Sequence, residues 1–153
     1  MDLVDSATRS RMMASIRGKD TKPELVVRQY LHAKGFRYRL HSRNLPGKPD
    51  LVLRRWSAAV FVHGCFWHGH VGCRYFRLPG TRTEFWARKI HGNIERDEQA
   101  VDALSRLGWR VFIVWECALR DEMEAALGDL EGLIRSHSAG AEIFSKVAQP
   151  PLK

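Results

Sequence analysis

Three cysteines and one histidine have the types and spacing of metal ligands. Cys65, His70 and Cys73 follow an apolar run with the spacing C-x4-H-x2-C, and Cys117, the only other cysteine, follows a second apolar run, WRVFIVW. Zinc favours this set, because thiolates and an imidazole complete a tetrahedron and four protein ligands leave no position for a reactive water. The sequence therefore predicts a structural zinc site. In the alternative interpretation, Cys117 is a buried core thiol and the histidines lie at the surface.

Size and composition predict one soluble domain. The chain has 153 residues, of which 44% are apolar, so it can bury one core. The odd number of cysteines and the acidic start, MDLVD, argue against disulfides and a secretory leader. No apolar run is long enough to span a membrane. We expect a cytoplasmic protein with no membrane partner.

Basic charge is concentrated in the first two thirds of the chain. The net charge is +8, and residues 1–97 hold 19 of the 25 Lys and Arg residues but only 8 of the 17 Asp and Glu residues. Aromatic residues alternate with the basic ones, as in FRYRLHSRNLPGKPD and CRYFRLPGTRTEFWARK. This pattern indicates nucleic acid, although a basic surface can also serve solubility alone.

The order of elements predicts an α/β domain. Thr21 to Glu24 match a helix capping box, and Gly35 ends the helix that follows. Later apolar periodicities predict the order α-β-β-β-α-β-α. We expect a basic arm at 1–19, a domain at 20–135 and a flexible tail at 136–153. Within the domain we expect strands at 36–41, 50–55, 58–64 and 109–115. We expect helices at 21–34, 81–107 and 120–135, the second of them either as one long helix or as two broken near Gly92.

One carboxylate lies where a nuclease would hold a metal ion. The turn NLPGKP delivers Asp50 to the start of a strand, next to a strand that ends in a histidine. A carboxylate there suits Mg²⁺ bound to a phosphate, because this ion prefers oxygen ligands and polarises the phosphate. The element order resembles the restriction-endonuclease-like core, αβββαβ with a mixed central sheet flanked by helices. Without that context, Pro49-Asp50 is an ordinary turn.

Six motifs resemble one enzyme family. TRSRMM, LPGKPDLV, FVHGCFWHGH, TRTEFW, NIERD and GWRVFIVWECAL are similar to the very short patch repair endonucleases over residues 6–120. The resemblance implies a bacterial enzyme, close to the nucleoid, that nicks double-stranded DNA 5′ of the thymine in a T:G mismatch left by 5-methylcytosine deamination. It implies catalytic Mg²⁺, structural Zn²⁺, a monomeric state and other mismatch-repair factors as partners.

The resemblance also implies residue roles. Asp50 matches a Mg²⁺ ligand, and Val62 matches a residue whose main-chain carbonyl helps to hold the ion, although threonine is usual there. His68 matches the residue that activates water, and Glu24 matches an acidic residue that orders metal-bound waters. We assign His63 a supporting catalytic role.

The residues alone leave alternatives open for these roles. Glu24 fits equally as the partner in the capping box, and His63 fits as a packed histidine at a strand end. His68 competes with His70 as a zinc ligand. His70 matches the family's ligand, although the spacing from His70 to Cys73 is one residue longer than usual.

Three aromatic residues match side chains that the family inserts into the base stack beside the mismatch. These are Phe66, Trp67 and Trp86. Stacking a base on an aromatic side chain returns roughly 1–3 kcal/mol. The alternative is that they are core residues, and for Trp86 the helical spacing to Ile90 supports that alternative equally.

Two other classes of function compete with the nicking enzyme. A non-catalytic, zinc-stabilised DNA-binding module would share the basic surface but would not need Asp50 or His68. A zinc hydrolase or deaminase is disfavoured, because the sequence has no H-x-E motif with a downstream P-C-x-x-C and the zinc shell is complete without water.

Overall fold

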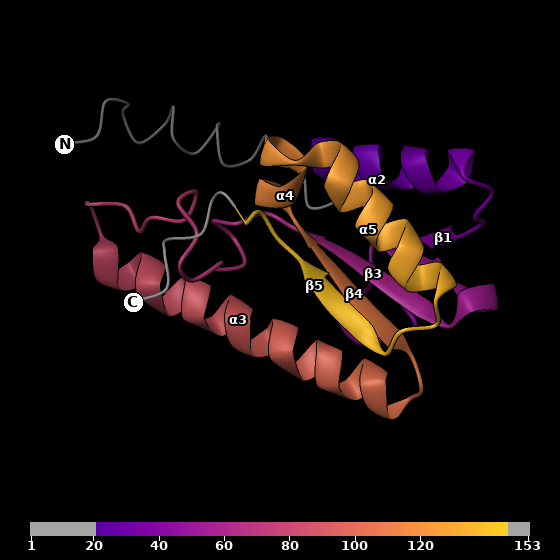
Figure 1. Cartoon of the computed structure of the whole chain (residues 1–153). Coiled ribbons are helices and arrows are strands. Elements are labelled where there is room, and N and C mark those ends of the chain that lie inside the picture. Colours follow the sequence, from indigo (N-terminus) through magenta and orange to yellow (C-terminus); the bar gives the residue numbers. More distant parts are fainter. Residues whose placement is uncertain (1–20, 147–153) are drawn as a thin grey trace.

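The computed structural model describes residues 21–146, which form a five-stranded mixed sheet covered by helices on both faces (Figure 1). The predicted basic arm at 1–19 lies outside the described residues. None of the helices in residues 21–146 is long and apolar enough to cross a membrane. The elements, in chain order, are α2 (Lys22–Ala33), β1 (Arg39–Leu40), β2 (Leu51–Leu53), the short 3-10 turn Arg54–Trp56, β3 (Ala58–His63), α3 (Thr83–Arg106), β4 (Arg110–Trp115), α4 (Glu116–Asp121), α5 (Met123–Arg135) and β5 (Gly140–Ile143).

The five strands lie side by side in chain order. β1, β2 and β3 form antiparallel pairs, whereas β3, β4 and β5 are parallel to one another. The register pairs Val62 with Val114 and His63 with Trp115. Because parallel strands end at the same edge of a sheet, the residues that follow β3 and β4 meet at one edge.

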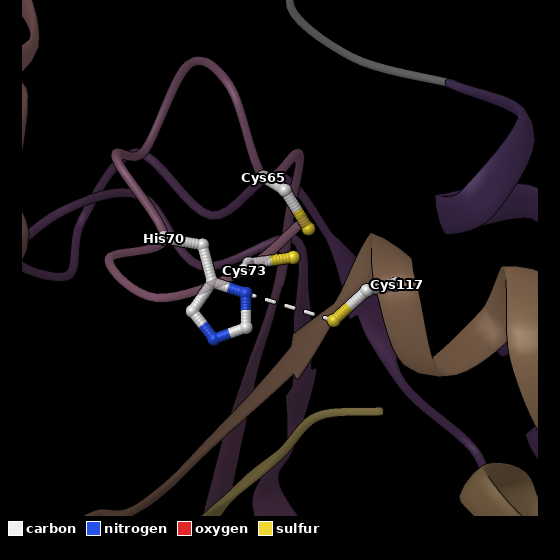
Figure 2. Close-up of side chains that lie close together, drawn as sticks. All are labelled: Cys65, His70, Cys73 and Cys117. Carbon is white, nitrogen blue, oxygen red and sulfur yellow. Dashed lines mark hydrogen bonds between the residues drawn. The ribbon is translucent and has the colours of Figure 1, made fainter. Parts of the chain in front are cut away.

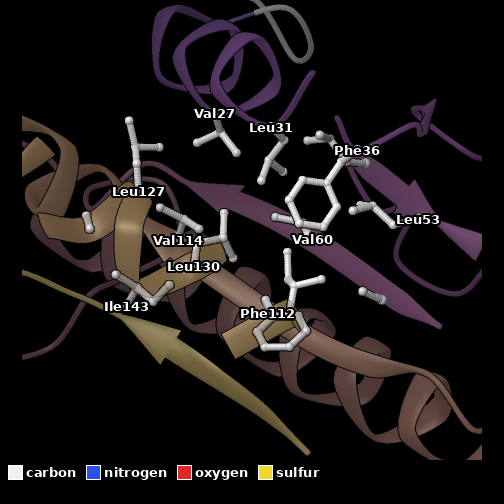
Figure 3. Packing of buried hydrophobic residues seen from close by; sticks show 14 of the residues in the cluster. Val27, Leu31, Phe36, Leu53, Val60, Phe112, Val114, Leu127, Leu130 and Ile143 are labelled. Atoms are coloured by element: carbon white, nitrogen blue, oxygen red, sulfur yellow. The ribbon is translucent and has the colours of Figure 1, made fainter. Parts of the chain in front are cut away.

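Two apolar cores lie on opposite faces of the sheet. Alternate residues of the central strands point to each face, as the pleat requires. Val60 and Phe112 pack with α2 and α5 (Figure 3), whereas Phe61 and Ile113 pack on the other face with Leu104 of α3. Burial on both faces explains why WRVFIVW is almost continuously apolar, and the predicted strand there is confirmed.

The first described helix begins as the sequence predicts. The Thr21 hydroxyl accepts a hydrogen bond from the main-chain N–H of Glu24, and Pro23 lies in the first turn, where its missing N–H costs nothing. α3 also forms as a single helix and is not broken at Gly92.

The structure differs from the sequence prediction at four places. The strand expected over 36–41 contains only residues 39 and 40, and the strand expected over 50–55 contains only Leu51–Leu53, because the 3-10 turn follows it. The last helix, expected over 120–135, begins at Met123 as α5 and is preceded by a separate short helix, α4. Within the segment expected to be a tail, residues 140–143 form strand β5 and extend the sheet. Gly140 permits this pairing, because a Cβ there would lie 2.6 Å from the carbonyl oxygen of Val111.

Candidate active site and metal centres

The three cysteines and His70 come together at the edge where β3 and β4 end. Cys65, His70 and Cys73 lie on the loop after β3, and Cys117 lies in the first turn of α4 (Figure 2). One ligand atom from each of the four lies within 4.8 Å of the others, and Cys117 Sγ is 3.6 Å from His70 Nδ1. These separations suit a tetrahedral ion with bonds of about 2.0–2.3 Å, so the donor set fits zinc. His68 does not belong to this group.

The surroundings of Cys117 favour its thiolate. Its pKa is lowered to about 4, mainly because the Cys65 thiol donates a hydrogen bond to its sulfur, with further hydrogen bonds from His70 and the main-chain N–H of Ser145. The same bond to Cys117, together with burial, raises the pKa of Cys65, and burial raises that of Cys73. A thiolate is the form that binds metal, so one ligand is prepared by the fold itself.

Asp50 and Glu24 form a second group with His41. The main-chain N–H of Val62 donates to Asp50 Oδ2 at 2.7 Å, which fixes this carboxylate against the end of β3. The pKa of Asp50 is raised to about 7, first by burial and further by the neighbouring Glu24, while the Val62 hydrogen bond opposes the rise. A buried carboxylate beside a half-buried one is costly unless a cation or a proton lies between them, so this group suits a divalent cation.

Glu24 points into this group from α2. It is only 2% exposed, and its carboxylate oxygens both lie 2.9 Å from His41 Nε2, with Arg28 at 3.3 Å. The main-chain N–H of Glu24 takes part in the helix cap. This bond is the Thr21 half of the capping box, whereas the carboxylate, which a capping box uses for its second bond, contacts His41 and Arg28 and faces Asp50.

His63 and His68 form the third group with Asp97. The imidazole rings stack at 3.7 Å with an angle of 2° between their planes, and His68 Nδ1 lies 2.7 Å from Asp97 Oδ2 on α3. A carboxylate accepts hydrogen bonds, so it holds the proton on Nδ1 of neutral His68 and leaves Nε2 with a free electron pair. His68 and Asp97 line a cavity of about 920 Å³ between α3 and β5.

His63 is held neutral in this group. It is 4% exposed, and its pKa is lowered to about 3, first by burial and then by the neighbouring His68. Its Nδ1 atom is buried and has no hydrogen-bond partner among the described residues. A buried, uncharged ring stacked on His68 restricts the orientation of that side chain.

Comparison with known proteins identifies the family. The sequence model described as "DNA mismatch endonuclease Vsr" matches residues 1–74. The chain is 44% identical to "DNA mismatch endonuclease Vsr" of Escherichia coli, over 93% of each chain. It is also similar to "Type II nicking enzyme V.XorIIP" of Xanthomonas oryzae pv. oryzae, with 45% identity over 88% of this chain and 95% of that one, and to "Type II nicking enzyme V.NmeAIP" of Neisseria meningitidis, with 43% identity over 79% and 86%.

The chain belongs to the Vsr DNA mismatch endonuclease family. It is therefore a DNA endonuclease, a hydrolase of phosphodiester bonds, and not a non-catalytic module. The resemblance seen in the motifs is confirmed at the level of the family. The relatives include both a mismatch endonuclease and several nicking enzymes, so membership establishes nicking of DNA.

Three aromatic residues that the Vsr resemblance singled out pack on one another, and two of them lie on the loop that carries His68. Phe66 and Trp67, on the loop after β3, have ring centroids 5.6 and 5.9 Å from that of Trp86 in the first turn of α3. All three are partly buried. They form a small aromatic cluster at the surface and do not belong to either core.

Two members of these groups were missed by sequence reasoning. Asp97 lies in the NIERD motif, but its partner His68 is 29 residues away and only the packing of α3 brings them together. His41 lies at the end of the short strand β1, where it looked like an exposed member of an alternating pattern. A polar residue at a strand end beside a turn was the only local signal for His41.

Proposed function

We propose that the chain nicks duplex DNA on the 5′ side of the thymine in a T:G mismatch arising from 5-methylcytosine deamination, by Mg²⁺-dependent hydrolysis. We also infer that the sheet and helices form a restriction-endonuclease-like core. One observation carries the proposal: two chemically different groups meet at the end of β3. The N–H of Val62 holds Asp50, and the ring of the next residue, His63, stacks on His68.

Asp50 and the main-chain carbonyl of Val62 would hold the Mg²⁺ ion, with Glu24 orienting its bound waters. The contact between the Asp50 and Glu24 carboxylates fits this assignment, because a cation relieves their repulsion. When bound, Mg²⁺ polarises the scissile phosphate and stabilises the leaving oxygen. Since a main-chain carbonyl does not depend on the side chain, valine at position 62 is compatible with this role.

His68 would take the proton from the attacking water. The hydrogen bond from Nδ1 to Asp97 orients the ring and stabilises the imidazolium that forms, so Nε2 acts as the general base. His63 would support this step by keeping the His68 ring in place through the stacking contact. His63 and His68 lie next to the end of β3, and the bond to Asp97 ties His68 to α3.

Zinc bound by Cys65, His70, Cys73 and Cys117 would have a structural role. Four protein ligands complete its coordination, so no water is available there for catalysis. The ion would tie the loop that carries Phe66, Trp67 and His68 to the start of α4.

The aromatic cluster of Phe66, Trp67 and Trp86 would open the base stack at the mismatch. Unstacking a step costs a few kcal/mol, and a mismatched step costs least. Basic residues of the chain would bind the phosphates without regard to sequence. Recognition of the mismatch would then depend on how easily the DNA deforms at that step, as well as on contacts with its bases.

Substitutions in the His68–Asp97 pair test this proposal. His68→Ala and Asp97→Asn should each reduce the single-turnover rate on a T:G duplex by about 10²–10⁴-fold, because general-base catalysis is lost. Affinity for the duplex should stay within a few-fold of the wild-type value. Glu98→Gln, which alters a neighbouring carboxylate on α3, is the matched control and should cut normally. If His68→Ala cuts at the wild-type rate, the assignment of the general base is wrong.

A further inference from the structure

His41 lies in contact with the carboxylates of the proposed magnesium site. Its Nε2 atom is 2.9 Å from each carboxylate oxygen of Glu24, and its main-chain N–H donates to the carbonyl oxygen of Asp50 at 3.0 Å. The His41 side chain is 24% exposed, whereas that of Glu24 is 2% exposed. The half-buried imidazole therefore lies between the buried Glu24 carboxylate and solvent.

The backbone of His41 is held in an unfavourable conformation at this point. Its φ angle is 49°, in the left-handed region that residues with a Cβ seldom adopt. Such a conformation is strained and persists where the surrounding structure imposes it. Here it turns the chain just after β1 and places the ring over Glu24.

We propose that His41 supplies a nitrogen ligand to the divalent cation that Asp50 would hold. This inference depends on the proposed function, which places the cation at Asp50. One ligand atom from each of Glu24, His41 and Asp50 lies within 4.8 Å of the others, so an ion bound to Asp50 would lie within reach of the imidazole. The donor set is then the Asp50 carboxylate, the Val62 carbonyl and the His41 imidazole, with Glu24 orienting bound waters.

An imidazole ligand changes which ions the site prefers. Mg²⁺ is bound almost entirely through oxygen, whereas imidazole nitrogen suits ions later in the first transition series, and Mn²⁺ accepts both kinds of donor. The site should therefore favour Mn²⁺ over Mg²⁺ more strongly than a site built from oxygen alone. If His41 only hydrogen-bonds to Glu24, its removal should change the affinity for both ions by the same factor.

Calorimetric titration of the zinc-loaded full chain with Mn²⁺ and with Mg²⁺ separates these cases. His41→Gln keeps an amide that can hydrogen-bond to Glu24 but replaces the nitrogen donor with oxygen. The ratio of Mn²⁺ to Mg²⁺ affinity should fall about tenfold or more in this variant. His91→Gln, on the exposed side of α3, is the matched control and should keep the wild-type ratio. An unchanged ratio in His41→Gln overturns the inference.

A measurement on the wild-type chain does not depend on the folding of a variant. Pulsed electron paramagnetic resonance of bound Mn²⁺ detects a nitrogen nucleus in its first coordination sphere. The proposal requires that nitrogen signal, and its absence overturns the proposal. Mn²⁺ is a poor competitor for a site of three thiolates, so the zinc group should not contribute.

Asp50→Ala distinguishes failure of this inference from failure of the proposed function. If Asp50→Ala binds both ions as the wild type does, the cation does not lie at Asp50, and the proposed site and the role of His41 are both wrong. If Asp50→Ala loses the ions while His41→Gln keeps the wild-type affinity ratio, only the inference about His41 is overturned.

Discussion

Ionised Asp50 suits a cation ligand but lowers the stability of the fold when no cation is bound. Burial and the neighbouring Glu24 raise its pKa to about 7, although the N–H of Val62 favours the carboxylate. A buried group with a raised pKa is ionised near neutral pH only at a cost to the fold, unless a cation compensates. The residue thus has the properties of a ligand, because the cost is recovered when an ion binds.

This conflict predicts that Asp50→Asn is more stable than the wild type in buffer free of divalent ions. The pKa of Asp50 is raised in the folded state, so the protonated side chain stabilises the fold fully below about pH 4. This stabilisation is lost as the pH rises through about 7 and Asp50 becomes ionised. At pH 8 the variant should gain roughly 1–3 kcal/mol in the free energy of unfolding, and the gain should shrink steadily as the pH falls and be nearly absent at about pH 4.

Thermal melts at both pH values measure this effect. Added Mg²⁺ should raise the melting temperature of the wild type but not that of Asp50→Asn, because only the wild type binds the ion at this position. Equal melting temperatures for the two proteins at pH 8, in buffer free of divalent ions, would show that Asp50 is not destabilising.

Some residues of the three groups can be predicted from the sequence, and others cannot. The clustering of Cys65, His70, Cys73 and Cys117 could be predicted, because three of the four lie within nine residues and cysteine is rare in this chain. Asp97 and His41 could not, because carboxylates and histidines are common on surfaces and only tertiary packing gives these two their partners.

At the scale of elements, α3 positions the loop that follows β3. The Asn93 side chain donates to the main-chain carbonyl of Trp67 at 2.8 Å, and one turn later Asp97 binds His68. Gly69 packs so closely on the helix that a Cβ there would lie 2.6 Å from side-chain atoms of Ile90 and Ile94. The loop that carries the aromatic side chains and His68, the proposed general base, is therefore fixed to α3.

The aromatic cluster leads to a prediction about discrimination between duplexes. Replacing both Phe66 and Trp67 with alanine should weaken binding to a T:G duplex more than to fully paired DNA, because only the wedged complex gains their stacking. The difference in binding free energy between the two duplexes should shrink by roughly 1–3 kcal/mol for each base stacked. Affinities for both duplexes, measured at one salt concentration together with a melting curve, check this.

The double variant should also be less stable than the wild type, and its effect on the two duplexes can exclude the wedge. Because the rings contact each other and Trp86, the double variant should melt a few degrees lower. If binding to the two duplexes falls by the same factor, the aromatic residues contribute to folding only and the wedge is excluded.

The elements themselves were predictable where local patterns are strong. Helix α2 has a cap and a stop signal, α3 has a long apolar period, and β4 is a continuous apolar run. β5 was missed because it is a short edge strand with a polar residue at position 142, and its pairing with β4 depends on Gly140. β1 was overestimated because residues 36–38 pack against α2 and α5 without pairing to a strand.

At the scale of the whole molecule, zinc would link segments that are far apart in the sequence. The loop after β3 and the start of α4 are joined through the four ligands, and the N–H of Ser145, beyond β5, donates to Cys117. Cys117→Ala should therefore lose zinc and melt at a lower temperature, because structural zinc contributes roughly 10–16 kcal/mol of binding free energy in small modules.

Metal analysis of the purified protein checks this prediction. The wild type should carry one zinc per chain, and Cys117→Ala should carry much less. A folded, active preparation of the wild type without zinc would contradict the structural assignment.

Strand-specific cleavage of a labelled duplex shows directly whether the chain nicks DNA on the 5′ side of a mismatched thymine. A duplex with one T:G pair, labelled on each strand in turn, is incubated with the protein and Mg²⁺ and resolved on a denaturing gel. We predict a single product, cut on the thymine strand immediately 5′ of the mismatched thymine, with the guanine strand and the matched C:G duplex intact. Cleavage of the C:G duplex at a comparable rate, or a cut on the guanine strand, would contradict the account.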